Sequence, residues 1–272
     1  MKITRTCLAG AAVILSLGLS AAADDWAQPL RKSEPRIKAQ ARDLGRSMTS
    51  GHGDGVLVSG KPFLGLFDSN VPEETQDAMR GDLAFVKGIQ GNGVSNLHQR
   101  IFGAVNGPIY MNFFKSHVRA VGLDSAYNSP GAMAYVSGDP SADHSKMWLT
   151  SNYIKFSLPQ VERVEIIFHE ARHTEMEHEF WPHARCPTPF LDENGNEVRG
   201  IVTGTPMAGH YACDTTPFGS YGSGMIMIKN IQKFCSNCGG KVLMDAGLYG
   251  DDTLKRMTDP KARKAIEDDL YR

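Results

Sequence analysis

Residues Glu165–His173 read Glu-Ile-Ile-Phe-His-Glu-Ala-Arg-His, a segment of helical period that carries a His-Glu-x-x-His motif. His169 and His173 are four residues apart, so on a helix both imidazoles leave one face, one turn apart. Such a pair forms a two-point clamp for a zinc ion. Glu170 is close enough to such an ion to act on a water molecule without being a ligand. The spacing predicts a metal site; the alternative is a structural helix whose histidines make ordinary hydrogen bonds.

The residues around this stretch favour a helix. Ser157 and Gln160 have the spacing of a capping box, and Pro159 suits a first helical turn. Four apolar residues then fall on one side of the helix, namely Val161, Val164, Ile167 and Phe168. We therefore expect a buried helix with a polar edge.

The beginning of the chain predicts export. Lys2 and Arg5 form a short basic start, the apolar run that ends near Leu19 is too short to span a bilayer, and residues 21–23 suit a cleavage site. We expect residues 1–23 to be a signal peptide, and the mature chain, residues 24–272, to be periplasmic or extracellular without a membrane span. The formal net charge of −1 gives no indication of a nucleic-acid or anionic-membrane partner.

The cysteines of the mature chain fit the same compartment. They are Cys186, Cys213, Cys235 and Cys238. In an oxidising compartment they favour two disulfides, and we expect the pairs Cys186–Cys213 and Cys235–Cys238. The alternative for Cys235 and Cys238 is half of a zinc ribbon or a redox motif, although the sequence has no second pair of this kind.

A zinc site of this type needs a third protein ligand. If the helix continued, His178 would lie about 140° round from His173, and we expect it to face solvent among the neighbouring glutamates. Trp181 and Pro182 are expected to stop the helix and turn the chain back. His183 is therefore the favoured third ligand.

A disulfide between Cys186 and Cys213 would hold their Cα atoms within about 7 Å and bring His183 and Asp214 to one region. Asp214 is then expected to be the hydrogen-bond partner of His183 or a substitute third ligand, with Glu177 as a further alternative.

Two other residues near these positions have assignments. Tyr221 is a candidate donor to an oxyanion, with ordinary packing as the alternative. His210, beside a glycine, is expected to be a loop residue.

The motif at His169–His173 resembles the active-site helix of the zincin metallopeptidases. The resemblance implies one zincin-like metallopeptidase domain over residues 24–272, an α+β fold that is helix-rich with a small central sheet next to this helix. It also implies one Zn²⁺ per chain, bound by the two histidines. Glu170 would then activate a zinc-bound water to hydrolyse peptide bonds in a protein or peptide substrate.

A second block, Cys213–Gly222, partly resembles the aspzincins, in which an Asp and then Tyr-Gly follow the motif helix. Asp214 precedes Tyr221 by seven residues here, a longer spacing than in that family. The metzincin pattern is not followed, because Glu179 stands where that pattern has a histidine. The two blocks together also resemble exported bacterial proteins of an uncharacterised subfamily.

Two other functions stay open. A non-catalytic, zinc-stabilised binding domain would use four protein ligands, and a zinc amidase acting on cell-wall peptides would use the same chemistry as a peptidase.

The remaining periodicity predicts elements on both sides of the motif. Helices are expected from residue 36 onward and at 72–90, 109–114, 216–234, 241–247 and 261–271; strands are expected at 56–58, 117–123, 132–136 and 147–154. The glycine-rich stretch 51–55 lacks the strand and helix that would flank a phosphate-binding loop.

Overall fold

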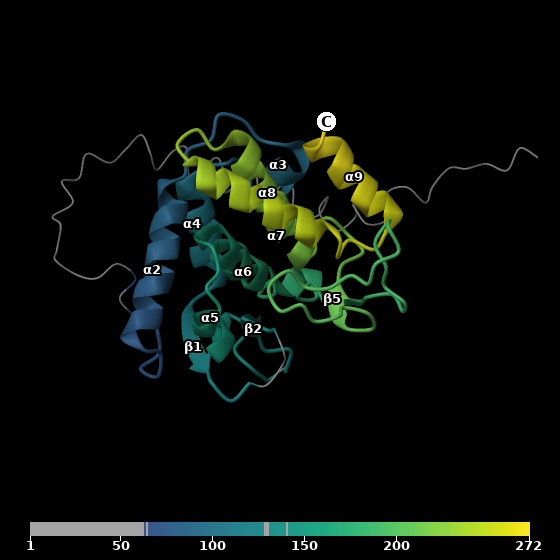
Figure 1. Cartoon of the computed structure of the whole chain (residues 1–272). Helices are drawn as coiled ribbons and strands as arrows, with labels where there is room; N and C mark the ends of the chain where they lie inside the picture. The colour runs from purple at the N-terminus through teal and green to yellow at the C-terminus, as the bar shows by residue number, and fades with distance from the viewer. Residues whose placement is uncertain (1–62, 64, 128–130, 140) are drawn as a thin grey trace, which may run out of the picture.

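The computed structural model describes residues 63, 65–127, 131–139 and 141–272. The predicted signal peptide, the helix from residue 36, the glycine-rich stretch 51–55 and the strand at 56–58 lie outside these residues. Within them the fold is α+β, with a small mixed sheet among the helices (Figure 1).

The predicted helices and strands that fall within these residues are present, but two short α-helices and two short strands were not predicted, and the helix expected at 241–247 extends to residue 254. The helices are α2 (Glu73–Gly88), α3 (Asn96–Ile101), α4 (Gly107–His117), α5 (Ser151–Lys155), α6 (Gln160–Arg172), the 3-10 helix η2 (Met176–His178), α7 (Ser220–Phe234), α8 (Gly240–Leu254) and α9 (Pro260–Leu270). The strands are β1 (Ala120–Asp124), β2 (Ala134–Val136), β3 (Lys146–Thr150), β4 (Ala184–Arg185) and β5 (Tyr211–Cys213). In the part of the chain that the structure describes, none of the helices is both long and apolar enough to cross a membrane.

Helix α6 carries the His-Glu-x-x-His motif and lies in the core. It begins directly after Pro159, and no side chain caps its first turn, so the predicted capping box at Ser157 is wrong. Pro159 takes the N-cap position instead, with φ −58° and ψ 150°, and its carbonyl accepts from the Glu162 and Arg163 amides at 3.1 and 3.2 Å. The predicted apolar stripe is buried, and each of its four members is at most 1% exposed. Phe168 packs against the ring of Phe102, at the end of α3, and against three rings of α4, those of Tyr110, Phe113 and Phe114.

Helices α6, α7 and α8 pack together and form the centre of the molecule. Figure 1 shows α7 and α8 side by side, α6 beneath them, α2 on one flank and the small sheet at the lower end. Gly224 allows α7 to approach α6 closely, since a Cβ at this position would lie 2.2 Å from Oε1 of Glu165.

The sheet lies beside α6 and has the order β1-β3-β2. β1 pairs with β3 in parallel, and β2 pairs with β3 in antiparallel register, with Tyr135 opposite Trp148. β2 is therefore an edge strand. The predicted strand 147–154 is wrong in its second half, because the chain turns into α5 after Thr150, whose hydroxyl accepts from the Asn152 amide at 3.1 Å.

The segment between β4 and β5 forms a lobe with its own small core, made of Cys186, Phe190, Val198, Met207 and Cys213. The Cys186–Cys213 disulfide closes this lobe at its base, and Cys235–Cys238 forms a second disulfide just after α7. Both pairs agree with the predicted pairing.

The contact between the end of α2 and the start of α4 gives a stability prediction. A Cβ at Gly107 would lie 2.1 Å from the Lys87 carbonyl oxygen, whereas a Cβ at Gly81, in the middle of α2, meets nothing within 4 Å. Gly107→Ala should lower the free energy of unfolding by about 1–3 kcal/mol, because backbone must move. Gly81→Ala should raise it by about 0.5–1 kcal/mol through helix propensity. Urea unfolding of both variants tests this; equal effects of the two substitutions would contradict the described packing.

Candidate metal centre

Three imidazole rings meet at the carboxyl-terminal end of α6. His169 lies in the last turn of the helix, His173 caps it, and His183 precedes β4. Nε2 of His173 lies 3.3 Å from Nε2 of His169 and 3.1 Å from Nε2 of His183. Among the described residues these three histidines form the group that could hold a metal ion, with ligand atoms all within 4.8 Å of one another.

The protonation of the rings fits a bound cation. Nδ1 of His173 faces the Phe180 carbonyl at 2.7 Å, and Nδ1 of His183 faces Oδ1 of Asp214 at 3.1 Å. Because a carbonyl and a carboxylate only accept, both Nδ1 atoms carry the proton and both Nε2 atoms turn lone pairs toward each other. A cation bound between them would remove this repulsion. Tetrahedral zinc with bonds of about 2.0–2.1 Å would separate its nitrogens by about 3.3–3.4 Å, close to the distances here.

Burial keeps the His169 and His173 rings in the neutral form that a metal needs. It lowers the pKa of His173 to about 4, and the neighbouring His183 acts in the same direction. Burial and the other two histidines lower the pKa of His169 well below its usual value. A neutral imidazole does not have to release a proton before it binds a metal.

The segment after α6 returns His183 to the helix. The prediction that α6 continues as far as Trp181 is wrong, because the helix ends at Arg172. Glu179, Phe180 and Trp181 have positive φ angles of 53°, 63° and 48°. This left-handed run reverses the chain, and it turns the Phe180 carbonyl toward His173.

A buried ion pair holds this turn. Arg172 pairs with Glu175 and donates to the Phe218 carbonyl at 2.7 Å, and Trp181 Nε1 donates to Glu175 at 2.7 Å. Burial alone would raise the pKa of Glu175, but Arg172 and hydrogen bonds from His117 and Trp181 lower it to about 2. The carboxylate therefore stays charged and links the end of α6 to the turn.

The prediction that His178 faces solvent is wrong. Its side chain is only 7% exposed, and its ring lies 4.5 Å from that of Trp181. The expected rotation around the helix does not apply, because α6 ends before this residue. Glu175, one of the neighbouring glutamates, is buried as well.

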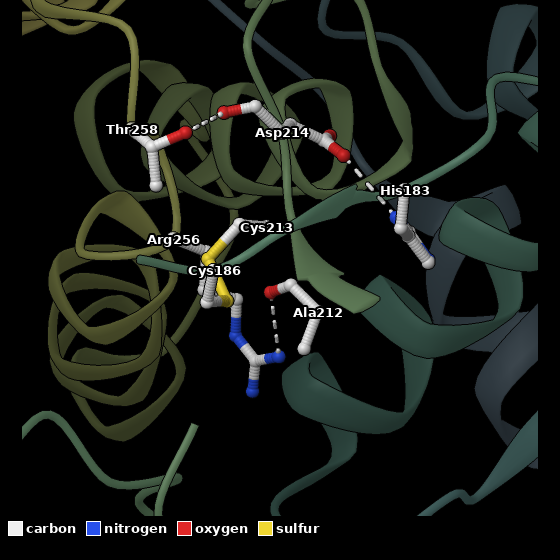
Figure 2. The surroundings of a disulfide bond; sticks show 7 residues. All are labelled: His183, Cys186, Ala212, Cys213, Asp214, Arg256 and Thr258. Atoms are coloured by element: carbon white, nitrogen blue, oxygen red, sulfur yellow. Dashed lines mark hydrogen bonds and ion pairs between the residues drawn. A yellow bond between two sulfur atoms is a disulfide. The ribbon is translucent and has the colours of Figure 1, made fainter. Parts of the chain in front are cut away.

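The carboxylate of Asp214 orients the His183 ring through a hydrogen bond to its Nδ1. Its Oδ2 accepts from the amides of Tyr221 and Gly222 at 2.9 and 3.1 Å, at the positive end of α7. Figure 2 shows the carboxylate pointing at His183, while the Asp214 carbonyl accepts from the Thr258 hydroxyl. Gly219 leaves room for this contact, since a Cβ there would lie 2.4 Å from Oδ2. Asp214 thus contacts the ring nitrogen of His183 that does not face the other two histidines.

Tyr221 covers the histidines on the side of α7. Its ring lies 4.4 Å from the His169 ring and 4.5 Å from the His183 ring, measured between centroids. The guanidinium of Arg256 lies 4.3 Å from the Tyr221 ring. Arg256 also donates to the Ala212 carbonyl at 3.4 Å, beside the Cys186–Cys213 disulfide (Figure 2).

The histidines open onto a cavity of about 780 Å³. Its wall includes β2 and the residues that follow it, one face of α6, the lobe between β4 and β5, and the segment after α8. Glu170 lines it, with one carboxylate oxygen 4.0 Å from Nε2 of His169. Burial raises the pKa of Glu170 to about 8, although a hydrogen bond with the backbone of Val136 opposes the rise. His210 and Tyr221 also line the cavity, whereas Glu177 is exposed outside it.

Comparisons of the chain with protein-family models, with curated proteins and with solved structures found no match.

Sequence reasoning missed three groups that build the site: the Phe180 carbonyl, the buried Glu175 and Arg256. Arg172 and Glu175 are three residues apart with opposite charges, which is a signal for an ion pair at the end of a helix. The carbonyl and Arg256 gave no signal, because a left-handed turn and a contact across more than thirty residues depend on the folded chain.

The geometry predicts different losses for the residues around the centre. His183→Ala should abolish stoichiometric zinc binding, because it removes one of three ligands. Asp214→Asn should keep the metal with affinity weakened roughly 10- to 100-fold, as for a residue that only orients a ligand. His210→Ala is the control, since this histidine lines the same cavity but is not in the triad. Zinc titration against a competing chelator measures all three; an Asp214→Asn variant that loses the metal entirely would make Asp214 a ligand.

Proposed function

We propose that this protein is an exported zinc metallopeptidase that hydrolyses peptide bonds. The observation that carries the proposal is the convergence of three imidazole Nε2 atoms beside the carboxylate of Glu170, all facing one cavity. His169, His173 and His183 would hold the metal, with Asp214 orienting the third ring.

Zinc bound there would lower the pKa of a water molecule and polarise the scissile carbonyl. Glu170 would accept the proton of the attacking water and pass it to the leaving amine. Its burial supports this role, because a pKa near neutrality suits a group that takes and returns a proton. Tyr221, packed on two of the three histidines, is the candidate donor to the oxyanion.

The edge strand β2 supports a peptide as the substrate. β2 is at the end of the β1-β3-β2 sheet, and Ala134, Tyr135 and Val136 all line the cavity. The free edge of a strand offers main-chain donors and acceptors to which an extended peptide can pair. A peptide laid along β2 would run past Glu170, which contacts the backbone of Val136.

The ligand count supports a catalytic centre over a closed structural one. A structural zinc site has four protein ligands, whereas catalytic sites have three and leave a position for water or substrate. Asp214, the fourth candidate from the sequence, is engaged by His183 and by the first turn of α7. The two disulfides fit the export that the signal-peptide prediction implies.

The proposal predicts that Glu170→Gln separates activity from metal binding. The amide keeps the shape of the side chain but cannot accept the proton, so kcat should fall at least about 10²-fold while zinc content and fold are retained. Glu177→Gln, the same change at an exposed glutamate outside the cavity, is the matched control. The assay is cleavage of a mixed peptide library by zinc-loaded protein, followed by mass spectrometry.

Two results would contradict the proposal. A zinc-loaded wild-type protein that cleaves no peptide would favour the non-catalytic binding domain, or, if it hydrolysed an amide bond in cell-wall peptides, the amidase. Equal cleavage by Glu170→Gln and wild type would remove Glu170 from the reaction.

A further inference from the structure

One face of α6 lines the cavity along its whole length. Glu162, Glu165, His169 and His173 follow one another at intervals of three and four residues, and all contribute to the cavity wall. The histidines occupy the end of the helix, and the two glutamates occupy its beginning. The cavity therefore has a carboxylate-lined part next to the candidate metal centre.

Glu165 is buried and Glu162 is half-buried, and each carboxylate has one oxygen without a hydrogen-bond partner in the described part of the chain. Glu165 is only 5% exposed. Two buried oxygens lack a hydrogen-bond partner among the described residues, namely Oε1 of Glu165 and Oε2 of Glu162. Asp252, 6% exposed, lines the cavity beside them and pairs with Lys255. A buried carboxylate with an unpartnered oxygen is costly, so a ligand that brings donors to these side chains from the cavity would stabilise them.

The charge of the cavity wall is acidic. Its carboxylates are Glu162, Glu165, Glu170, Glu179 and Asp252, and among the described residues that line it Arg256 is the one lysine or arginine. The Arg256 side chain is already engaged, because it stacks on Tyr221 and donates to the Ala212 carbonyl. Burial raises the pKa of Glu165 to about 8 and that of Glu162 well above its usual value, and Arg256 opposes both rises without cancelling them, so a further cationic group would stabilise the charged form of both carboxylates.

We propose that Glu162 and Glu165 form a subsite for a cationic group of the substrate, an ammonium or a guanidinium. This inference rests on the proposed function. Along the helix the glutamates lie four and seven residues from His169, about 6 and 10 Å at 1.5 Å per residue. An extended peptide advances about 3.3 Å per residue, so the subsite would take a Lys or Arg within about three residues of the cleaved bond.

The test compares peptides that differ in one charge. N-acetylated, C-amidated hexapeptides carry Lys, acetyl-lysine or Glu at each position in turn, so no terminal charge contributes. Wild-type zinc protein should prefer Lys over acetyl-lysine at one position by roughly 10- to 100-fold in kcat/KM, the size expected for a hydrogen bond to a charged group. No preference, or a preference for Glu through Arg256, would overturn the subsite.

Glu165→Gln and Glu162→Gln identify the residues responsible. Each should reduce the preference for Lys by roughly 10-fold and leave cleavage of the acetyl-lysine peptide within about 2-fold of wild type. Two separate variants keep the test decisive if one fails to fold. Glu74→Gln, at an exposed position of α2, is the matched control. An unchanged preference in both cavity variants would contradict the assignment.

A binding measurement separates failure of the subsite from failure of the proposed function. Calorimetry on zinc-loaded Glu170→Gln should show the Lys peptide binding roughly 10-fold tighter than the acetyl-lysine peptide, and adding Glu165→Gln should abolish the difference. If wild type cleaves nothing but this difference is present, the proposed peptidase is wrong and the subsite stands. If cleavage occurs without the difference, the subsite is wrong and the peptidase stands.

Discussion

The hydrogen bond between His183 and Asp214 joins two parts of the chain that the site cannot do without. His183 comes back to α6 on the turn that follows the motif helix, and Asp214 comes from the end of β5. The Cys186–Cys213 disulfide fixes these two segments to each other, and the first turn of α7 fixes the carboxylate through two backbone amides. One carboxylate thus sets the tautomer of a candidate ligand and caps a core helix. Loss of its charge would loosen both contacts.

Several features that lower the stability of the fold lie near this hydrogen bond. Three consecutive residues with positive φ, the buried Arg172–Glu175 pair and the buried glutamates of α6 each disfavour folding when considered alone. The apolar packing of α6, α7 and α8 and the two disulfides offset these costs. Deviations from stable local structure that gather at one cavity indicate a site of function.

The sequence predicted the elements whose signals are local. The stripe on α6, the proline before it and the acidic first turn of α2 lie within a few residues of what they specify, and these helices were found near the expected residues. The convergence of His169, His173 and His183 followed from spacing together with a disulfide. The turn at Glu179–Trp181, the burial of His178 and the contact of Arg256 with Tyr221 were not predictable, because they depend on side chains brought together from distant segments. The capping box failed because proline supplied the helix start that it would have provided.

The proposed function requires that the three histidines hold a metal whose remaining position faces the cavity. A crystal structure of the zinc-loaded protein tests it most directly. We expect one zinc ion bound by the Nε2 atoms of His169, His173 and His183 at about 2.0–2.1 Å, with a non-protein oxygen in the fourth position and Asp214 hydrogen-bonded to Nδ1 of His183. A zinc ion bound by four protein side chains, or by Asp214 in place of His183, would contradict the account.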